Sequence, residues 1–135
     1  MDVEVGQKAT RTMKVDAAVV RAFAGITGDY NPLHFDEEFV ARTRFGRLIA
    51  QGGIATGLLH ALVAMDLPGA GSVFVRQSWK FPNPVYIGDM ITAIGTVKSV
   101  KPKRGMAEME FRVTDQNGEV VVEGDGLVYQ TQPPD

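Results

Sequence analysis

The sequence predicts an α+β domain in which an antiparallel sheet encloses one long helix. Helix patterns occur in the first half of the chain, and strand patterns separated by short turns fill the second half. Between them lies a helix pattern that is apolar on nearly every side, and such a helix must be covered by protein. Consecutive strands with tight turns favour an antiparallel sheet, so the long helix is expected to pack inside it.

The first half predicts one short strand and two helices. Residues 8–14 alternate in polarity and predict a strand. Asp16 is a suitable N-cap for a helix that continues to about Ile26, and Gly25 and Gly28 are expected to end it. Its predicted apolar stripe consists of Val19, Ala22, Phe23 and Ile26. Asp36 is a suitable cap for a second helix from Glu37 to about Arg42.

The long apolar helix is predicted from Gly52 to Met65, and Leu67-Pro68-Gly69 ends it. Gly57 is expected where a strand backbone presses close to the helix. His60, on the same helix, is expected to be a partly buried, hydrogen-bonded histidine rather than a catalytic group. The helix is too short and too interrupted to span a bilayer comfortably.

Four strands are predicted in the second half. In the first of them, Val73, Val75, Gln77, Trp79 and Phe81 are expected to share one face. Pro82-Asn83-Pro84 follows, which predicts an irregular end or an edge position. Asp115-Gln116-Asn117-Gly118 is a strong hairpin signal. The predicted strands are residues 72–81, 90–101, 106–115 and 119–130.

Composition bounds the class of protein. A chain of 135 residues predicts a single domain over residues 1–135, with a polar tail at 131–135 that is expected to fray. The formal charge of −2 gives no reason to expect nucleic acid or an anionic membrane as a partner. The absence of cysteine excludes disulfides, thiol nucleophiles and thiolate metal sites, and it is compatible with the cytoplasmic location that we expect. The N-terminal stretch has no long apolar run, so we expect neither a signal peptide nor a membrane anchor.

The segment Gly28–Asp36 carries the strongest chemical signal. It places Asp29 and His34 within five positions of each other, across Pro32. Proline fixes its own φ and pushes the preceding Asn31 towards extended geometry, so a stiff loop is expected rather than a helix interior. A carboxylate beside an imidazole is a plausible proton-transfer pair. The alternative is a structural turn in which Asp29 and Asn31 bond local backbone, and the spacing alone leaves both open.

A second signal is the start of the long helix. Helix N-termini offer unpaired N–H groups and a positive dipole end, and Gly52 and Gly53 would let a ligand oxygen approach them closely. A developing oxyanion needs this arrangement, although a simple loop-to-helix turn also explains the glycines. Together with the apolar helix, the two signals suit the addition of water to a carbon–carbon double bond conjugated to a thioester.

Three segments carry a resemblance to a known family. Residues 23–36 resemble the hydratase motif of the MaoC-like (R)-specific enoyl-CoA hydratases, and residues 46–52 and 81–89 are similar to that family's later segments. The resemblance implies a single hotdog fold, paired edge to edge into a homodimer or a larger dimer-based assembly. It also implies a place in fatty acid metabolism through reversible syn hydration of a trans-2-enoyl-CoA to the (R)-3-hydroxyacyl-CoA. No cofactor is implied, since coenzyme A is part of the acyl-CoA substrate.

The resemblance also assigns residues. Asp29 and His34 match the catalytic pair that holds and deprotonates the attacking water, Asn31 matches a residue that braces the loop, and Gly52 matches the backbone donor to the thioester oxygen. The chain departs from the family at three candidate pocket positions. Many relatives have His-Gly in place of Gln51-Gly52, a bulkier residue in place of Gly53, and a smaller residue in place of His60, which could shorten or polarise the acyl pocket.

Other kinds of site are disfavoured. Two histidines with Asp29 and Asp36 give too few well-spaced ligands for a metal. No glycine-rich fingerprint opens a helix, so a nucleotide site is not expected. One basic group is expected to be a solvated surface, with contact to coenzyme A phosphates as the alternative; it comprises Lys98, Lys101, Lys103 and Arg104.

Two other functions compete with hydration. Hotdog thioesterases usually carry a catalytic carboxylate on the long helix, but residues 54–65 contain no acid. A non-catalytic acyl-CoA-binding subunit would keep the fold, yet it has little use for both members of an acid/base pair. Both alternatives are therefore ranked below hydratase activity.

Overall fold

A computed structural model describes residues 1–132 of the chain. The predicted fraying of the tail 131–135 falls mainly on residues 133–135, which lie outside the described residues. Ten elements follow in order: β1 Lys8–Lys14, α1 Ala17–Thr27, α2 Pro32–Phe35, α3 Glu37–Ala41, α4 Gly52–Met65, β2 Ser72–Lys80, β3 Met90–Lys101, the 3₁₀ turn η1 Pro102–Arg104, β4 Met106–Thr114 and β5 Val120–Gln130.

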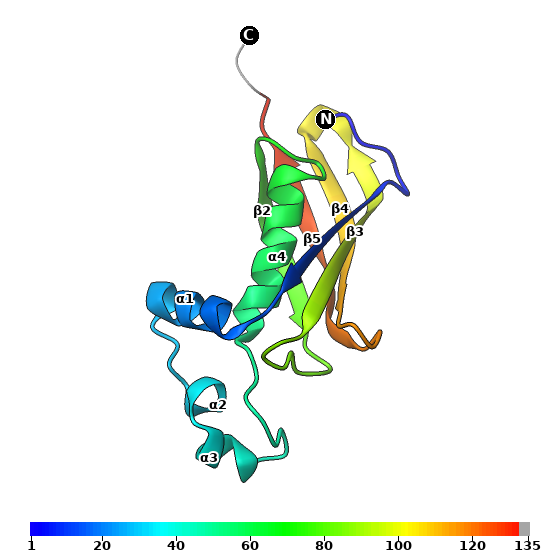
Figure 1. Cartoon of the computed structure of the whole chain (residues 1–135). Coiled ribbons are helices and arrows are strands. Elements are labelled where there is room, and N and C mark those ends of the chain that lie inside the picture. Colours follow the sequence, from blue (N-terminus) through cyan, green and yellow to red (C-terminus); the bar gives the residue numbers. More distant parts are fainter. Residues whose placement is uncertain (133–135) are drawn as a thin grey trace.

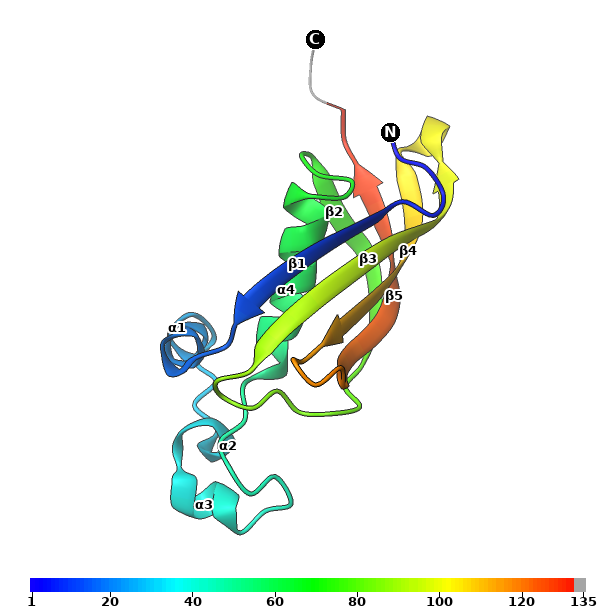
Figure 2. The same cartoon turned by 45° about the vertical axis from the view of Figure 1, so that its right-hand side comes forward.

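The strands form one antiparallel sheet in the order β1-β3-β4-β5-β2. Figures 1 and 2 show this sheet curving around α4, with α1, α2 and α3 gathered near the end where α4 begins. Gly118 adopts φ 78° in the turn between β4 and β5, as the hairpin signal predicts. The predicted α+β architecture is confirmed.

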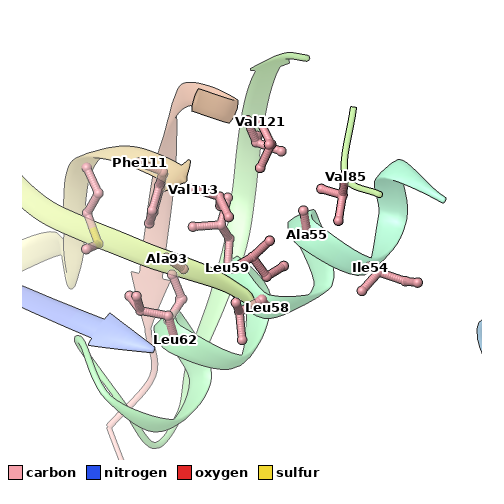
Figure 3. Packing of buried hydrophobic residues seen from close by; sticks show 14 of the residues in the cluster. Ile54, Ala55, Leu58, Leu59, Leu62, Val85, Ala93, Phe111, Val113 and Val121 are labelled. Atoms are coloured by element: carbon pink, nitrogen blue, oxygen red, sulfur yellow. The ribbon is translucent and has the colours of Figure 1, made fainter. Parts of the chain in front are cut away.

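The core lies between one face of the sheet and α4. Leu59 and Leu62 of α4 are fully buried and face Ala93, Phe111 and Val113 on the central strands (Figure 3). Burying each leucine side chain contributes roughly 1.5–3 kcal/mol. Gly95 allows this close packing, because a Cβ atom there would lie 2.8 Å from Leu62 Cδ2. The apolar packing fixes the position of α4, and therefore that of its N-terminus.

The sheet covers only part of α4. Gly57, His60, Ala64 and Met65 are exposed, and a Cβ atom added at Gly57 would meet nothing within 4 Å. The predictions that protein surrounds this helix and that a strand presses on Gly57 are therefore wrong for the single chain. The reason is geometric: five strands wrap one side of the helix, and no other described element covers the opposite side.

The caps of α1 follow the sequence, but only part of its predicted stripe does: Val19 and Phe23 are half-buried against the core, whereas Ala22 and Ile26 are exposed. Asp16 accepts a hydrogen bond from the Val19 N–H at 3.0 Å, and Gly28 ends the helix with φ 80°. Gly25 lies inside the helix, so the prediction that it ends the helix is wrong. The buried residues are Val20 and Ala24, while Ile26 is 82 % exposed. α1 contacts α4 only near the start of α4. The covered face of α1 is therefore narrower than the predicted stripe of Val19, Ala22, Phe23 and Ile26.

The predicted alternation in β2 is also interrupted. The pairing register with β5 shifts between Phe74 and Arg76, which indicates a β-bulge at Val75. Beyond the bulge the side chains change face, so Phe74 and Trp79 meet on the helix side with their ring centroids 6.0 Å apart. Val73 and Val75 are exposed, and the prediction that they share a face with Trp79 is wrong.

Candidate active site

Asp29 lies in a tight turn directly after α1. Its backbone N–H donates to Thr27 Oγ1 at 3.2 Å, and its carboxylate Oδ1 accepts from the Asn31 N–H at 3.3 Å. The side chain is 42 % exposed, so one carboxylate oxygen is used locally while the group remains accessible. The turn therefore has both the structural role and the accessible acid that the sequence left as alternatives.

His34 lies on α2, a single helical turn that the sequence did not predict. Pro32 occupies its first turn, where its fixed φ suits helix initiation and its missing N–H costs nothing. Asn31 is the N-cap, and its Oδ1 accepts from the Leu33 N–H at 3.1 Å. The expectation of a continuous loop is wrong for residues 32–35, because the proline restricts a helix interior but favours a helix start. The capping bond ties Asn31 to the turn that carries His34.

The two candidate catalytic groups face each other. His34 Nε2 lies 3.7 Å from Asp29 Oδ1, and the His34 side chain is only 8 % exposed. On its other side, Nδ1 lies 2.6 Å from the carbonyl oxygen of Ile49. A carbonyl can only accept, so Nδ1 carries the proton and donates it. In the neutral imidazole, the lone pair of Nε2 is then directed towards Asp29.

Two glycines begin α4, and their surroundings differ. Gly52 is exposed, and a Cβ atom there would come within 3.1 Å of Phe81 Cε1. A Cβ atom at Gly53 would lie 2.3 Å from Phe23 Cζ, so this aromatic ring fills the space beside it. This contact concerns only the Cβ side of Gly53, so the approach of a ligand oxygen to its main chain stays a prediction. Gly52 remains as the exposed residue at the positive end of the helix dipole.

A cavity of about 240 Å³ adjoins Gly52. Its walls include Phe45, Ala55, Phe81 and Val85, which make it largely apolar. A larger hollow of about 490 Å³ lies on the outward face of the sheet, beside Lys80 and other charged side chains, and involves none of the candidate residues. The smaller cavity is thus the one that meets the N-terminus of α4.

The other candidate pocket residues occupy different places. Gln51 is buried, with 2 % exposed surface, and does not line the cavity beside Gly52. His60 is exposed; its Nε2 lies 3.0 Å from Gln77 Oε1, and its ring packs on Phe74 at 4.6 Å between centroids. The predicted hydrogen bond of His60 is confirmed, and its predicted partial burial is wrong. It lies eight positions after Gly52, or about 12 Å further along the helix.

The basic group lies at the end of the sheet opposite the start of α4 (Figure 1). Lys98 Nζ is 3.6 Å from a carboxylate oxygen of Glu110, and all four side chains are exposed. This placement favours a solvated surface over contact with a ligand held at Gly52 of the same chain. The group consists of Lys98, Lys101, Lys103 and Arg104.

The segment that leads into α4 contributes contacts that the sequence analysis missed. Ile49 pairs with Tyr86 in an isolated β-bridge, and the Tyr86 hydroxyl donates to the carbonyl oxygen of Phe45 at 3.1 Å. The Arg47 guanidinium lies 3.8 Å from the centroid of the Tyr86 ring. These contacts hold the carbonyl of Ile49 against His34. A main-chain acceptor leaves no side-chain signal, although Tyr86 belongs to the segment 81–89 that carried the resemblance.

Within residues 1–132, no three histidine or acidic side chains gather closely enough to hold a metal ion. Over the same residues, no helix has the length and apolar character needed to cross a membrane.

The chain is similar to known proteins over nearly its whole length. Residues 2–118 match the MaoC like domain. The chain is 39 % identical over 126 residues to an (R)-specific enoyl-CoA hydratase from Aeromonas caviae, covering 93 % of this chain and 94 % of that protein. It is also 39 % identical to a 3-hydroxybutyryl-CoA dehydratase from Methylorubrum extorquens, covering 94 % and 80 % of the two chains. The solved structure of an A. caviae (R)-hydratase superposes with a TM-score of 0.90 at 38 % identity, covering 96 % of this chain and 98 % of that one.

Proposed function

The chain belongs to the family of MaoC-like dehydratases, and from that premise we propose that it is an (R)-specific enoyl-CoA hydratase. Its sheet curved around α4 is the hotdog fold that the resemblance implied. The reaction is reversible syn addition of water to a trans-2-enoyl-CoA, which gives the (R)-3-hydroxyacyl-CoA. Relatives that cover almost the whole chain carry this activity in their names.

The observation that carries the proposal is the separation of 3.7 Å between His34 Nε2 and Asp29 Oδ1. This distance is too long for a direct hydrogen bond. A water oxygen at about 2.8 Å from each atom fits between them, with one hydrogen directed at each acceptor. The remaining lone pairs of that water are then free to attack carbon. Asp29 and His34 thereby act together on a single water molecule.

The N-terminus of α4 supplies the second part of the site. Attack at the β-carbon pushes negative charge onto the thioester oxygen, where the N–H of Gly52 can donate to it. The positive end of the helix dipole stabilises the same charge. The cavity of about 240 Å³ beside Gly52 offers room for the thioester end of the substrate.

The Asp29–His34 pair takes up one proton and gives one proton back during the reaction. As the water oxygen bonds to the β-carbon, one water proton passes to the Asp29–His34 pair. The enolate then collapses, and a proton from the pair bonds to the α-carbon on the same face. The carbonyl of Ile49 holds Nδ1 throughout, so the imidazole stays in one tautomer and orientation.

The arrangement disfavours the thioesterase alternative. The nearest acid to α4 in sequence is Asp66, which follows the helix at the end remote from Gly52. Asp66 pairs with Arg11 at 3.3 Å. The long helix therefore has no residue that could act as the water-activating carboxylate of a thioesterase.

One assay distinguishes the three functions. The protein is mixed with crotonyl-CoA, while the ultraviolet absorbance of the conjugated thioester and the release of free thiol are both followed. A hydratase lowers the absorbance and releases no thiol, whereas a thioesterase releases thiol and a binding subunit changes neither. Loss of absorbance without thiol is the expected result, and chiral analysis should identify the product as the R isomer.

We further infer that a second copy of the chain pairs with the β2 edge. The two edges of the sheet differ in their exposed apolar residues: β2 carries Val73 and Val75 near its start, 55 % and 53 % exposed, ahead of Arg76 and Lys80, whereas the cations of β1 include both of its end residues, Lys8 and Lys14. Charged side chains protect an edge strand from pairing, and exposed apolar ones invite it. Pairing at β2 would also cover the exposed face of α4, including Met65.

We also propose that the enzyme acts in the cytoplasm, since a chain without cysteine suits a reducing compartment.

A further inference from the structure

Gln51 joins three parts of the site although it lines no cavity. It is the residue that precedes α4, and its side chain makes no capping bond to that helix. Instead Nε2 donates to the carbonyl oxygen of Val20 on α1 at 3.1 Å, and to that of Asp29 at 3.4 Å. Both neighbours are carbonyl oxygens, so the NH₂ side of the amide must face them. One buried side chain thus links α1, the Asp29 turn and the start of α4.

The other half of this amide has no partner. Within the described residues, Gln51 Oε1 is buried and accepts no hydrogen bond. Leaving a buried acceptor unpaired costs stability, and an apolar side chain of the same length would avoid that cost. Filling space therefore does not explain a glutamine here. The donor half of the amide explains the glutamine, because it bonds two main-chain carbonyl oxygens that belong to different elements.

We propose that Gln51 is a positioning residue that fixes the distance between the Asp29 carboxylate and the Gly52 amide. The two groups act on opposite ends of the reacting system, since one handles the water and the other the thioester oxygen. Asp29 sits in an exposed turn, whose own bonds, such as the one from the Asn31 N–H, are local to that turn. Gln51 directly precedes Gly52, so its bond to the carbonyl oxygen of Asp29 connects that turn to the start of α4. This inference rests on the proposed hydratase function.

The size of the expected effect follows from the geometry. The bond to Asp29 is long, and the shorter bond to Val20 acts on Asp29 only through α1. Misplacing a reacting group by about 1 Å can cost on the order of 100-fold in rate. A weak, partly indirect tether should cost less, so we expect a decrease in kcat of about tenfold when the amide is removed. KM should change by less than about twofold, because Gln51 does not line the cavity.

The test compares two substitutions of Gln51 with a control at Gln130 by steady-state hydration of crotonyl-CoA. Gln51→Met keeps the length and removes the donor, so kcat should fall. Gln51→His supplies a ring N–H as the donor in place of the amide, and it should retain more of the parental kcat than Gln51→Met. Gln130→Met is the matched control: Gln130 Nε2 also donates to two carbonyl oxygens, at 3.0 Å and 3.4 Å, but beyond the far end of α4, and kcat should not change.

Gln51→Glu adds a pH readout that a purely structural role would not produce. Burial raises the pKa of a carboxyl group, and the protonated form can still donate to a carbonyl oxygen. The ratio of kcat for Gln51→Glu to kcat for Gln51→Met should therefore be above one at pH 6 and fall as the pH rises and the introduced carboxyl group ionises. Taking the ratio removes the pH dependence that the two variants have in common.

The outcomes are distinct. An inactive parental enzyme would refute the proposed hydratase function itself. An active parental enzyme whose kcat is unchanged in Gln51→Met, or equally reduced in Gln51→Met and Gln51→His, would overturn the positioning role. Should Gln51→Met fail to fold, the pH dependence of kcat for Gln51→Glu is compared with that of the parental enzyme instead. A larger relative loss at high pH then supports the role, and parallel profiles refute it.

Discussion

The Nδ1 atom of His34 lies 2.6 Å from the main-chain carbonyl oxygen of Ile49. This contact makes the orientation of the imidazole depend on the segment that leads into α4. Gln51, two residues further on, reaches the Asp29 turn from the same segment. The two side chains that we propose to activate water and the helix end that we propose to receive the enolate charge are therefore all tied to one stretch of chain, which Tyr86 holds in place.

Replacing His34, the proposed catalytic histidine, should abolish most activity without unfolding the protein. We expect His34→Gln to lower kcat for crotonyl-CoA hydration by about 100-fold, because the general base is lost. The matched control is His60→Gln, which changes the chain's other histidine on the exposed face of α4 and should change kcat by less than about threefold. Equal losses in the two variants would contradict the assignment.

Gly53 should tolerate a side chain poorly. Gly53→Ala places a Cβ atom 2.3 Å from Phe23 Cζ, so the ring must move and the packing of α1 on α4 must loosen. We expect the free energy of unfolding, measured in urea, to fall by about 1–2 kcal/mol. Gly25→Ala provides the comparison within α1, since a Cβ atom there meets nothing within 4 Å. This variant should gain up to about 1 kcal/mol, as expected for an open helix interior. A stability change of the same sign in both would refute the argument.

The β2 edge should control association. Val75→Lys places a charge on the exposed apolar edge, and we expect sedimentation analysis to show a shift from dimer to monomer. Val5→Lys also replaces an exposed valine, but in the turn before β1, and it should leave the dimer intact. Dissociation of both variants, or of neither, would argue against pairing at β2.

The sequence was most informative where a side chain has one strong local preference. Asp16, Gly28 and Asp36 mark helix ends in the structure as their chemistry predicts. The long helix runs from Gly52 to Met65 as predicted, because its apolar pattern and the following Pro68 leave little choice. The juxtaposition of Asp29 and His34 follows from Pro32, although the proline starts a helical turn instead of prolonging a loop.

Relationships between distant segments were not predictable in this way. Nothing in the residue types indicates that Phe23 fills the space beside Gly53, or that the carbonyl of Ile49 orients His34. The bulge at Val75 depends on the register with β5, so strict alternation placed Val73 and Val75 on the wrong face. The uncovered face of α4 has a similar origin. The apolar composition of α4 indicated that protein covers this face, but a second copy of the chain can provide that cover as well as the same chain can.

The most direct test of the mechanism compares kcat/KM for crotonyl-CoA hydration in two acid-to-amide variants. Asp29→Asn removes the accessible carboxylate beside His34, and Asp16→Asn removes the carboxylate that caps the other end of α1. Asparagine is as good an N-cap as aspartate, so the second change should leave both stability and activity near parental values. The account predicts a loss of about 100-fold or more in Asp29→Asn alone, with its melting temperature unchanged. Near-parental activity in Asp29→Asn would contradict it.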